Sequence, residues 1–349
     1  MSKANNILVS IIIPVYNTPR DFFENCIESI VCTECNSYEI ILVDDGSEEE
    51  NSLFYKKFSS KYEKIVYLKK ENGGVSSARN KGIITARGKY IAFVDADDVI
   101  APNFLSEVIE IAGEYDCDII IGSISCDVTI MIPQTKKELV FLPKEKIKSL
   151  KKRFLQIPQP DIPYGVSGSP CAKLYKKNIV EQIMFSEQMT HSEDQLFNRK
   201  IFDIVESAVV VPNCWYIYNQ NDFSAMHNMK PGEYLKKLIP FFEEWERLNV
   251  EEEDKKIRTG ARAGSILLFF VAVNDIVSDG SLSSVEQIKK LRDLYSYSIF
   301  ANLVKEPPEK ENISRYERFR LFLIRKKMVY AIYMFVYIRR KVRKFVGTL

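Results

Sequence analysis

Four short runs of β-branched and aliphatic residues recur in the N-terminal part of the chain, each followed by polar residues or a turn. They occupy residues 8–17, 38–47, 64–72 and 89–98. Segments that we predict to be helices lie between them at residues 19–32, 48–62 and 75–86. Strands that alternate with helices in this way pair in parallel. The sequence therefore predicts an α/β sheet that binds its ligands at the carboxyl ends of the strands.

The loop after the first predicted strand excludes two glycine-rich nucleotide sites. A dinucleotide-binding unit requires G-x-G-x-x-G there, whereas this chain has Pro14-Val15-Tyr16-Asn17-Thr18. A P-loop requires Gly-Lys-Ser/Thr at a helix start, and that pattern is also missing. The phosphates of a bound nucleotide must then be met by other groups, of which metal-bound carboxylates are the obvious choice.

Three carboxylates lie within the four residues Asp95-Ala96-Asp97-Asp98, directly after the fourth run. Because like charges repel, we expect a positive group beside them. Mg²⁺ and Mn²⁺ prefer oxygen ligands and commonly take one or two protein carboxylates, with water and phosphate oxygens completing the shell. The alternative is an Asp-rich turn that caps a helix beginning near Pro102, a role that suits Asp98.

Composition indicates a folded protein in a reducing compartment. The 349 residues are 46% apolar and 28% charged, which allows a catalytic domain and an additional element. The chain has seven cysteines, an odd number, and their spacing follows no disulfide framework. This suits a reducing compartment. The N-terminus passes from polar residues into the first strand without a signal-peptide pattern. We therefore expect a cytoplasmic protein.

The C-terminal part, residues 229–349, is predicted to be helical and ends in a basic segment. Residues 315–349 hold eleven Lys and Arg and the single acidic residue Glu317, a local charge of +10 in a chain of net +2. Their longest uncharged run, Met328 to Ile338, is too short to cross a bilayer, which takes about 20 residues. Two interpretations remain: a peripheral contact with the inner face of the cell membrane, or packing on the catalytic domain or a partner subunit. No motif supports nucleic-acid binding.

Four motifs occur in an order that resembles family 2 glycosyltransferases: VSIIIPVYN, IILVDDGS, NGGVSSARNKGIITARGKYIAFVDADD and HSEDQLFNRKIF. The resemblance runs from about Val9 to Asn221. It implies a GT-A fold, a Rossmann-like nucleotide-diphospho-sugar transferase domain with a mostly parallel sheet flanked by helices, followed by a helical C-terminal region. Residues 1–228 would form the catalytic domain, with a nucleotide-binding half (1–100) and an acceptor half (101–228).

The resemblance also implies a donor site for a uridine diphosphate sugar or another nucleotide sugar. Asp44 would accept a base N–H and Asp45 would support the Asp-Gly turn, although these roles are exchangeable. Asp97 would bind Mn²⁺ or Mg²⁺, assisted by Asp95, and His227 would either complete the metal shell or be an exposed loop histidine. The expected donor-binding residues are Pro14, Val15, Tyr16, Asp44, Asp45, Arg79, Asn80, Asp95 and Ala96. The alternatives are a packed aromatic side chain for Tyr16 and a surface ion pair for Arg79.

The base that deprotonates the acceptor is expected to be a carboxylate, since the chain has only two histidines. By resemblance to the family motif E-D-x-x-F, Asp194 is the general base and Glu193 supports it or binds the acceptor. The competing interpretation treats Ser192 and these acids as a helix N-cap. Lys173, in the segment before this motif, either approaches a phosphate or is solvated. After the motif, Asn219 and Asn221 occupy positions where arginines are common in the family, so we do not assign a diphosphate contact to them.

These residues lead to one functional prediction and two alternatives. We expect an inverting, metal-dependent glycosyltransferase that uses a nucleotide sugar and a glycan or lipid-linked glycan acceptor. The first alternative is a nucleotidyltransferase, which normally has a glycine-rich, basic loop near its first strand. The second is a non-catalytic carbohydrate-binding or scaffold subunit, against which the intact Asp97 and Asp194 count.

Overall fold

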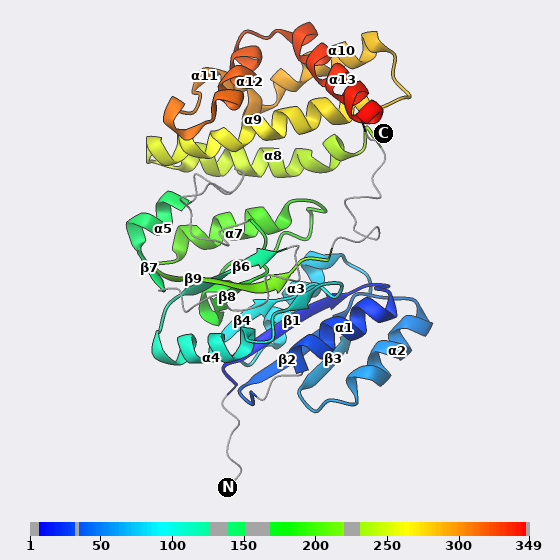
Figure 1. Ribbon diagram of the computed structural model, residues 1–349, viewed down its shortest axis with the longest axis vertical. Coiled ribbons are helices and arrows are strands. Elements are labelled where there is room, and N and C mark those ends of the chain that lie inside the picture. Colours follow the sequence, from blue (N-terminus) through cyan, green and yellow to red (C-terminus); the bar gives the residue numbers. More distant parts are fainter. Residues whose placement is uncertain (1–6, 32–34, 126–138, 151–167, 220–230, 347–349) are drawn as a thin grey trace. The chain divides into compact units, whose positions relative to one another are not determined.

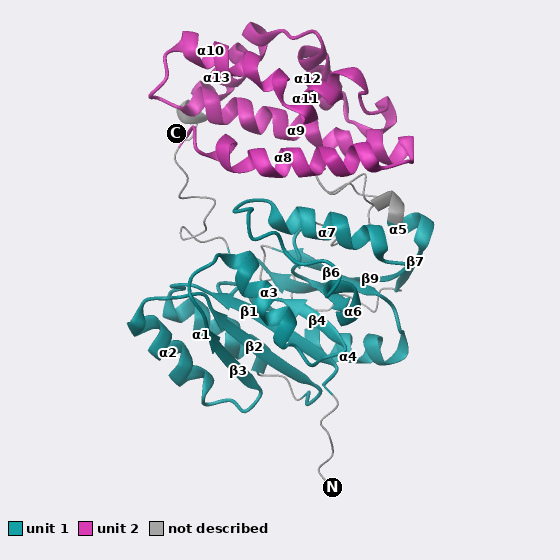
Figure 2. Cartoon of the chain, turned by 180° about the vertical axis from the view of Figure 1, so that it is seen from behind, with its two compact units in different colours: residues 1–148, 158–221 teal, residues 149–157, 222–349 magenta. Residues whose placement is uncertain are grey.

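The computed structural model describes residues 7–31, 35–125, 139–150, 168–219 and 231–346. The chain divides into two compact units, shown in different colours in Figure 2. Unit 1 comprises residues 1–148 and 158–221, and unit 2 comprises residues 149–157 and 222–349. His227 and Asn221, two residues considered above, lie outside the described residues.

Unit 1 is built on one nine-stranded sheet (Figure 1). Its strands are β1 (Val9–Val15), β2 (Tyr38–Asp44), β3 (Ile65–Lys69), β4 (Tyr90–Phe93), β5 (Val99–Ile100), β6 (Ile119–Ser125), β7 (Val140–Pro143), β8 (Lys173–Lys176) and β9 (Ser207–Ile217). β1 and β2 are buried along nearly their whole length, as expected for strands covered on both faces.

The sheet is mixed, with the order β3-β2-β1-β4-β8-β6-β9-β5 and β7 beside β9. The first four strands are parallel to one another, as predicted. β8 runs antiparallel to both β4 and β6, and β5 and β7 run antiparallel to β9. β6 pairs in parallel with β9. The expected parallel pairing therefore holds among the first four strands, and the rest of the sheet combines parallel and antiparallel pairs. The later strands lack the regular strand-helix alternation that predicted parallel pairing.

Helices cover both faces of this sheet. They are α1 (Arg20–Val31), α2 (Glu49–Ser59), α3 (Val75–Thr85), α4 (Phe104–Glu114), α5 (Lys144–Leu150), α6 (Lys177–Val180) and α7 (Glu193–Ile204). α1 buries Phe23, Cys26, Ile27 and Ile30, the face that helical spacing selects. These side chains and those of α2 and α4 share one core with alternate residues of β1. α3 lies on the opposite face, close enough that a Cβ on Gly82 would stand 2.3 Å from Ile12 Cγ2.

Unit 2 is helical in its described part. Its helices are α8 (Tyr234–Glu251), α9 (Lys255–Ser278), α10 (Ser284–Asp293), η3 (Leu294–Ser296), α11 (Ser298–Lys305), η4 (Lys310–Asn312), α12 (Arg315–Arg325) and α13 (Val329–Val346). Among the described helices, α9 alone is long and apolar enough to cross a membrane, but 83% of its most apolar window is buried within the protein. We interpret α9 as the core helix of the unit.

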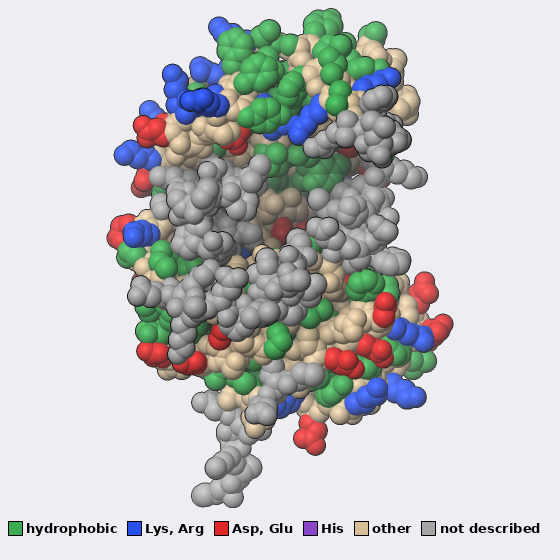
Figure 3. Space-filling view, viewed as in Figure 1, with side chains coloured by type: hydrophobic (Ala, Val, Ile, Leu, Met, Phe, Trp, Pro, Cys, Tyr) green, Lys and Arg blue, Asp and Glu red, His purple; other side chains and the backbone are tan. Residues whose placement is uncertain are grey.

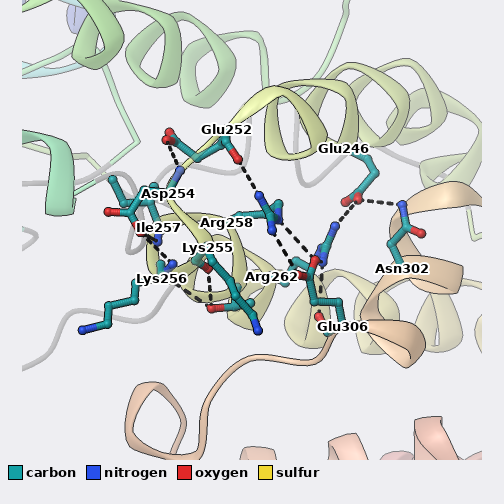
Figure 4. Close-up of polar contacts among 11 residues, drawn as sticks. Glu246, Glu252, Asp254, Lys255, Lys256, Ile257, Arg258, Arg262, Asn302 and Glu306 are labelled. Carbon is teal, nitrogen blue, oxygen red and sulfur yellow. Dashed lines mark hydrogen bonds and ion pairs between the residues drawn. The ribbon is translucent and has the colours of Figure 1, made fainter.

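A buried ion pair fixes α9 to its neighbours (Figure 4). Arg262 of α9 and Glu246 of α8 are both almost completely buried, and their atoms Nη2 and Oε1 are 3.0 Å apart. Glu306, at the end of α11, accepts hydrogen bonds from Arg262 and Arg258. Asn302 of α11 donates to Glu246 at 2.8 Å. Buried charges persist only when they are paired in this way.

Candidate functional site

The predicted site residues follow strands that are neighbours in the sheet. β1 pairs in parallel with β2 on one side and β4 on the other, with Val15 opposite Asp44 and Ile12 opposite Phe93. The carboxyl ends of these strands therefore lie at the same edge of the sheet. Asp44 ends β2, and Asp95 follows two residues after β4.

Arg79 connects this edge to the start of α7. Its Nη2 donates to Asp95 Oδ1 at 2.8 Å, and its Nη1 donates to Glu193 Oε1 at 3.3 Å. The side chain of Arg79 is 5% exposed, which rules out the surface ion pair that we considered. Burial alone would lower the pKa of Arg79, but the carboxylates of Asp95 and Glu193 outweigh burial and raise it. The guanidinium is the positive group expected beside the Asp95–Asp98 loop.

Asn80, the next residue of α3, holds the chain that leads to α7. Its side-chain oxygen accepts from the backbone N–H of Phe185, and its side-chain nitrogen donates to the carbonyl of Phe185 and to Glu187. The Phe185 ring stacks on Phe197 of α7 with centroids 3.9 Å apart. Asn80 therefore positions the loop that precedes Glu193, and a contact with the donor stays a prediction.

Asp194 lies at the first turn of α7 and is half-buried. Its Oδ1 accepts from the backbone N–H of Gln195 at 2.7 Å. Burial, and then the charge of Glu193, raise the pKa of Asp194, while Arg79 opposes them. Ser192 has a positive φ of 60° and its side chain makes no capping bond, so the serine cap of the competing interpretation is not formed. A carboxylate with a raised pKa at this place suits proton transfer.

Lys173 of β8 is buried and not solvated. It is 1% exposed, and its ammonium donates to the carbonyl of Ser169 at 2.6 Å. Burial lowers the pKa of Lys173 to about 8, whereas the charge of Asp194 opposes this. In the same segment, Cys171 Sγ lies 3.6 Å from Asp95 Oδ2, and a Cβ on Gly168 would stand 2.6 Å from the side chain of Gln195. The segment 168–173 thus packs against both the Asp95 loop and the start of α7.

The Asp95–Asp98 loop is held from β9, a contact that the sequence did not indicate. The Tyr216 hydroxyl donates to Asp98 Oδ2 at 2.6 Å and accepts from the backbone N–H of Asp95 at 3.1 Å. Asn219 donates its backbone N–H to Asp98 Oδ1 and its side-chain amide to the Asp97 carbonyl. Asp98 is 1% exposed, and burial and the charge of Asp95 raise its pKa to about 7. The residue at the N-cap position of α4 is Asn103, so Asp98 fastens the loop and does not cap that helix.

We predict that Tyr216→Phe loosens this loop. The change removes the donor to Asp98 and the acceptor for Asp95, leaving buried polar groups without partners, which costs about 1–3 kcal/mol of unfolding free energy. Urea denaturation measures that loss, and titration with a nucleotide sugar measures any loss of donor affinity. The control is Tyr218→Phe, because Tyr218 is 39% exposed near the end of the same strand. Equal stability of the two variants would contradict the assigned role.

Asp44 and Asp45 are both buried and both hold loops. Asp44 accepts from the backbone N–H of Ser47 and from the hydroxyls of Ser52 and Tyr67. Burial would raise the pKa of Asp44, but these hydrogen bonds outweigh it and lower the pKa. Asp45 accepts from Lys70 and from the backbone N–H groups of Gly73 and Gly74. A contact of either carboxylate with a nucleobase stays a prediction.

The loop after β1 presents one exposed ring. Tyr16 is 55% exposed, so it is not a packed aromatic side chain, and its ring is available for stacking. Val15 is buried and Pro14 half-buried. The neighbouring Asn17, which we did not predict, has a positive φ of 48° and accepts from the backbone N–H of Glu48 and from the Asn51 amide. Asn17 thereby joins the loops that follow β1 and β2.

The residues at the tip of β4 fit a hard divalent cation. Asp95 and Asp97 would supply carboxylate oxygens, whereas Ala96 is buried and has no side chain that could be a ligand. Within the described ranges, no group of three or more His, Cys, Asp and Glu side chains is placed to hold an ion. One or two carboxylates suffice for Mg²⁺ when substrate oxygens and water complete the shell. These two carboxylates therefore suit a divalent ion whose remaining ligands include the diphosphate oxygens of a bound nucleotide sugar.

Comparison with known sequences links the chain to sugar transfer. The family described as Glycosyl transferase family 2 matches residues 10–183. The protein named uncharacterized glycosyltransferase EpsJ of Bacillus subtilis (strain 168) is 29% identical over 346 residues, which cover 94% of this chain and 95% of that protein. The poly(ribitol-phosphate) beta-glucosyltransferase of Bacillus spizizenii (strain ATCC 23059 / NRRL B-14472 / W23) is 36% identical over 120 residues, which cover 33% of this chain and 19% of that protein.

Comparison with solved structures gives the same fold. The crystal structure of S. aureus TarS 1-349 has a TM-score of 0.65 and 19% sequence identity, covering 96% of this chain and 91% of that one. TarS 1-349 in complex with UDP-GlcNAc has a TM-score of 0.55 and 17% identity, covering 96% and 92%. At this level of identity the likeness concerns the fold.

Proposed function

This chain belongs to glycosyl transferase family 2 and is a glycosyltransferase, and we propose that it is a metal-dependent, inverting enzyme. In this proposal a sugar passes from a uridine diphosphate sugar, or another nucleotide sugar, to a hydroxyl of a glycan or lipid-linked glycan. Family membership sets aside the nucleotidyltransferase and scaffold alternatives.

One observation carries the proposal: Arg79 joins Asp95 to Glu193, two residues that belong to motifs far apart in the sequence. Glu193 and Asp194 are neighbours, so the expected donor motif and the expected base motif meet at a single buried cation. An enzyme that moves a sugar needs its leaving group and its base close to the same carbon atom. The arrangement therefore supports donor and acceptor chemistry at one site.

Asp194 is proposed to accept the proton of the acceptor hydroxyl as the new bond forms, assisted by its raised pKa. Glu193 holds Arg79, and Arg79 holds Asp95 at the donor side. Asp97, with Asp95, would hold Mn²⁺ or Mg²⁺, which supplies Lewis-acid neutralisation of the diphosphate charge. His227 is a further proposed ligand, although it lies outside the described residues.

Inversion follows from direct attack by the acceptor on the face opposite the leaving diphosphate. An α-linked donor sugar would then give a β-linked product. One relative, which aligns with 33% of this chain, is named a poly(ribitol-phosphate) beta-glucosyltransferase. That name is consistent with a β-linked product. The UDP-GlcNAc complex of TarS supports a uridine nucleotide sugar as donor. We extend the proposal to the assembly of cell-envelope polysaccharide or glycoconjugate.

We place the reaction on the cytoplasmic side of the membrane. The described cysteines, Cys26, Cys35, Cys117, Cys171 and Cys214, are all free thiols. Free thiols without disulfides suit a reducing compartment.

The metal requirement gives the direct test. We expect the chain, incubated with a panel of nucleotide sugars, to release nucleoside diphosphate only when Mn²⁺ or Mg²⁺ is present. Chelation should stop the release, and Asp97→Ala should weaken metal-dependent donor binding by about tenfold or more, since it removes a charged ligand. Isothermal titration with and without metal measures that loss. Release of pyrophosphate, or full activity in a chelator, would overturn the proposal.

A further inference from the structure

The two C-terminal helices expose a large apolar surface. On α12 it consists of Tyr316, Phe319 and Phe322, and on α13 of Tyr330, Met334 and Ile338, each between 45% and 62% exposed. We call these six side chains the α12–α13 outer surface. Extended apolar surfaces of this kind on a folded protein usually mark an interaction site.

The six side chains form one stripe on each helix. Their spacing of three or four residues places them on one face of α12 and one face of α13. The other face of each helix packs inside unit 2, where Leu321 and Ile324 of α12 and Ile332 of α13 are buried. A surface helix normally turns polar residues outward, so an outer face this apolar needs an explanation beyond folding.

The two stripes are joined across the helix pair. The Phe335 ring of α13 lies with its centroid 6.3 Å from that of Tyr316 and 6.0 Å from that of Phe319. Arg339 of α13 donates to the Tyr316 hydroxyl at 3.1 Å. Side chains of both helices therefore contribute to one continuous surface.

Basic side chains accompany this surface. Arg325, Lys326 and Lys327 are exposed where α12 ends and the chain turns into α13. Figure 3 shows Lys and Arg beside hydrophobic side chains on the visible face of the helical unit. The segment's single acid, Glu317, is engaged with Ser314 in the capping box of α12. The surface thus combines apolar side chains with nearly uncompensated positive charge.

We propose that the α12–α13 outer surface binds the surface of an anionic lipid bilayer, with both helices lying in the plane of the interface. Aromatic and aliphatic side chains enter the boundary between headgroups and acyl chains, while Lys and Arg contact anionic headgroups. This goes beyond the transfer chemistry, because it rests on unit 2 alone. It would hold the enzyme where a lipid-linked acceptor is found.

Charge and the exposed apolar side chains favour a bilayer over two other occupants. A second copy would bring the same local charge of +10 against this surface, and like charges across an interface oppose association. Nucleic acid would satisfy the basic side chains but would leave Met334 and Ile338 without apolar partners. A bilayer satisfies both kinds of side chain.

The test is flotation of the full-length protein with vesicles of phosphatidylcholine alone or with about 30% phosphatidylglycerol. We expect binding to the anionic vesicles only, and weaker binding when NaCl rises from about 0.1 M to about 0.5 M. Met334→Glu combined with Ile338→Glu should lower the partition coefficient by about tenfold or more, because two charges then face the acyl boundary.

The matched control is Leu53→Glu combined with Val250→Glu, which adds the same charge at side chains that are 58% and 59% exposed on α2 and α8. This control should bind anionic vesicles within about twofold of the unmodified chain. Thermal unfolding followed by circular dichroism checks that both double variants fold. The proposal is wrong if the unmodified chain does not float with anionic vesicles, if both double variants lose binding equally, or if light scattering shows that the surface instead joins two copies of the chain.

Discussion

Replacing Asp194 by asparagine is expected to lower turnover by about 10²- to 10⁴-fold, the range that a general base contributes. The amide cannot accept the acceptor proton, yet it has nearly the same shape and can still accept the bond from the Gln195 N–H. Donor affinity should therefore stay within about twofold, since the proton acceptor is needed only in the transition state. Steady-state transfer kinetics and titration with the nucleotide sugar separate the two quantities.

The control for this variant is Asp203→Asn on the same helix. Asp203 lies near the other end of α7, where it accepts from Arg199. We expect this variant to keep its turnover, although the loss of the Asp203 charge leaves Arg199, which is almost completely buried, with a weaker partner. Comparable losses of turnover in the two variants would show that α7, and not the Asp194 carboxylate, is what the reaction requires.

The assignment of Asp194 as general base also predicts how turnover depends on pH. A general base works only when ionised, so turnover is present above its pKa and is lost as pH falls through it. Because burial and Glu193 raise the pKa of Asp194, turnover should fall at a higher pH than it would for a solvent-exposed aspartate. Glu193→Gln removes one cause of that rise, so the fall should move to lower pH. A fall that stays in place in Glu193→Gln would contradict the electrostatic coupling of the two acids.

The strands and helices of the nucleotide-binding half could be predicted from the sequence, because each one has its own pattern of apolar residues within a short segment. Each of the first four strands is a short apolar run, and a helix with its own spacing separates it from the next. The parallel order around β1 follows from that alternation. The later strands carry no such pattern, so the antiparallel pairing of β8 with β4 and β6 could not be read from periodicity.

The candidate site was predictable in its residue types but not in its connections. Motif resemblance selected Arg79, Asp95 and Glu193, yet nothing local shows that one guanidinium bonds both acids. The same holds for Tyr216, which lies 121 positions from Asp95 and fastens its loop. Lys173 was expected to face solvent or a phosphate, and only the packing of the segment 168–173 shows that it is buried. Contacts between distant segments depend on tertiary packing, which a single sequence does not display.

Arg79 is the residue whose loss we expect to affect both stability and function. Arg79→Met keeps a long side chain but removes the cation between Asp95 and Glu193, which leaves two carboxylates without their shared partner. Breaking a fully buried ion pair from one side costs about 3–5 kcal/mol, and the loss here should be smaller because Asp95 is 36% exposed and water can solvate its charge. Urea denaturation should therefore show a lower free energy of unfolding, mainly because Glu193, which is 11% exposed, loses its partner. Turnover should fall as well, because both acids lose the group that holds them. Arg79→Lys keeps the charge but lacks the planar fork that reaches two acids, so we expect it to recover part of the stability and little of the turnover.

A second substitution separates the electrostatic cause from simple loss of packing. If the damage in Arg79→Met comes from uncompensated negative charge, adding Glu193→Gln should restore part of the unfolding free energy, because one of the two acids is then neutral. Turnover should not return, since the connection between the Asp95 loop and α7 is still absent. Arg247→Met is the matched control: its ion pairs with Glu244 and Glu251 involve a side chain that is 51% exposed, and exposed pairs contribute about 0–1 kcal/mol. If Glu193→Gln lowered the stability of Arg79→Met further, the guanidinium would be acting through packing, and the shared cation could no longer explain how the donor and base motifs are held together.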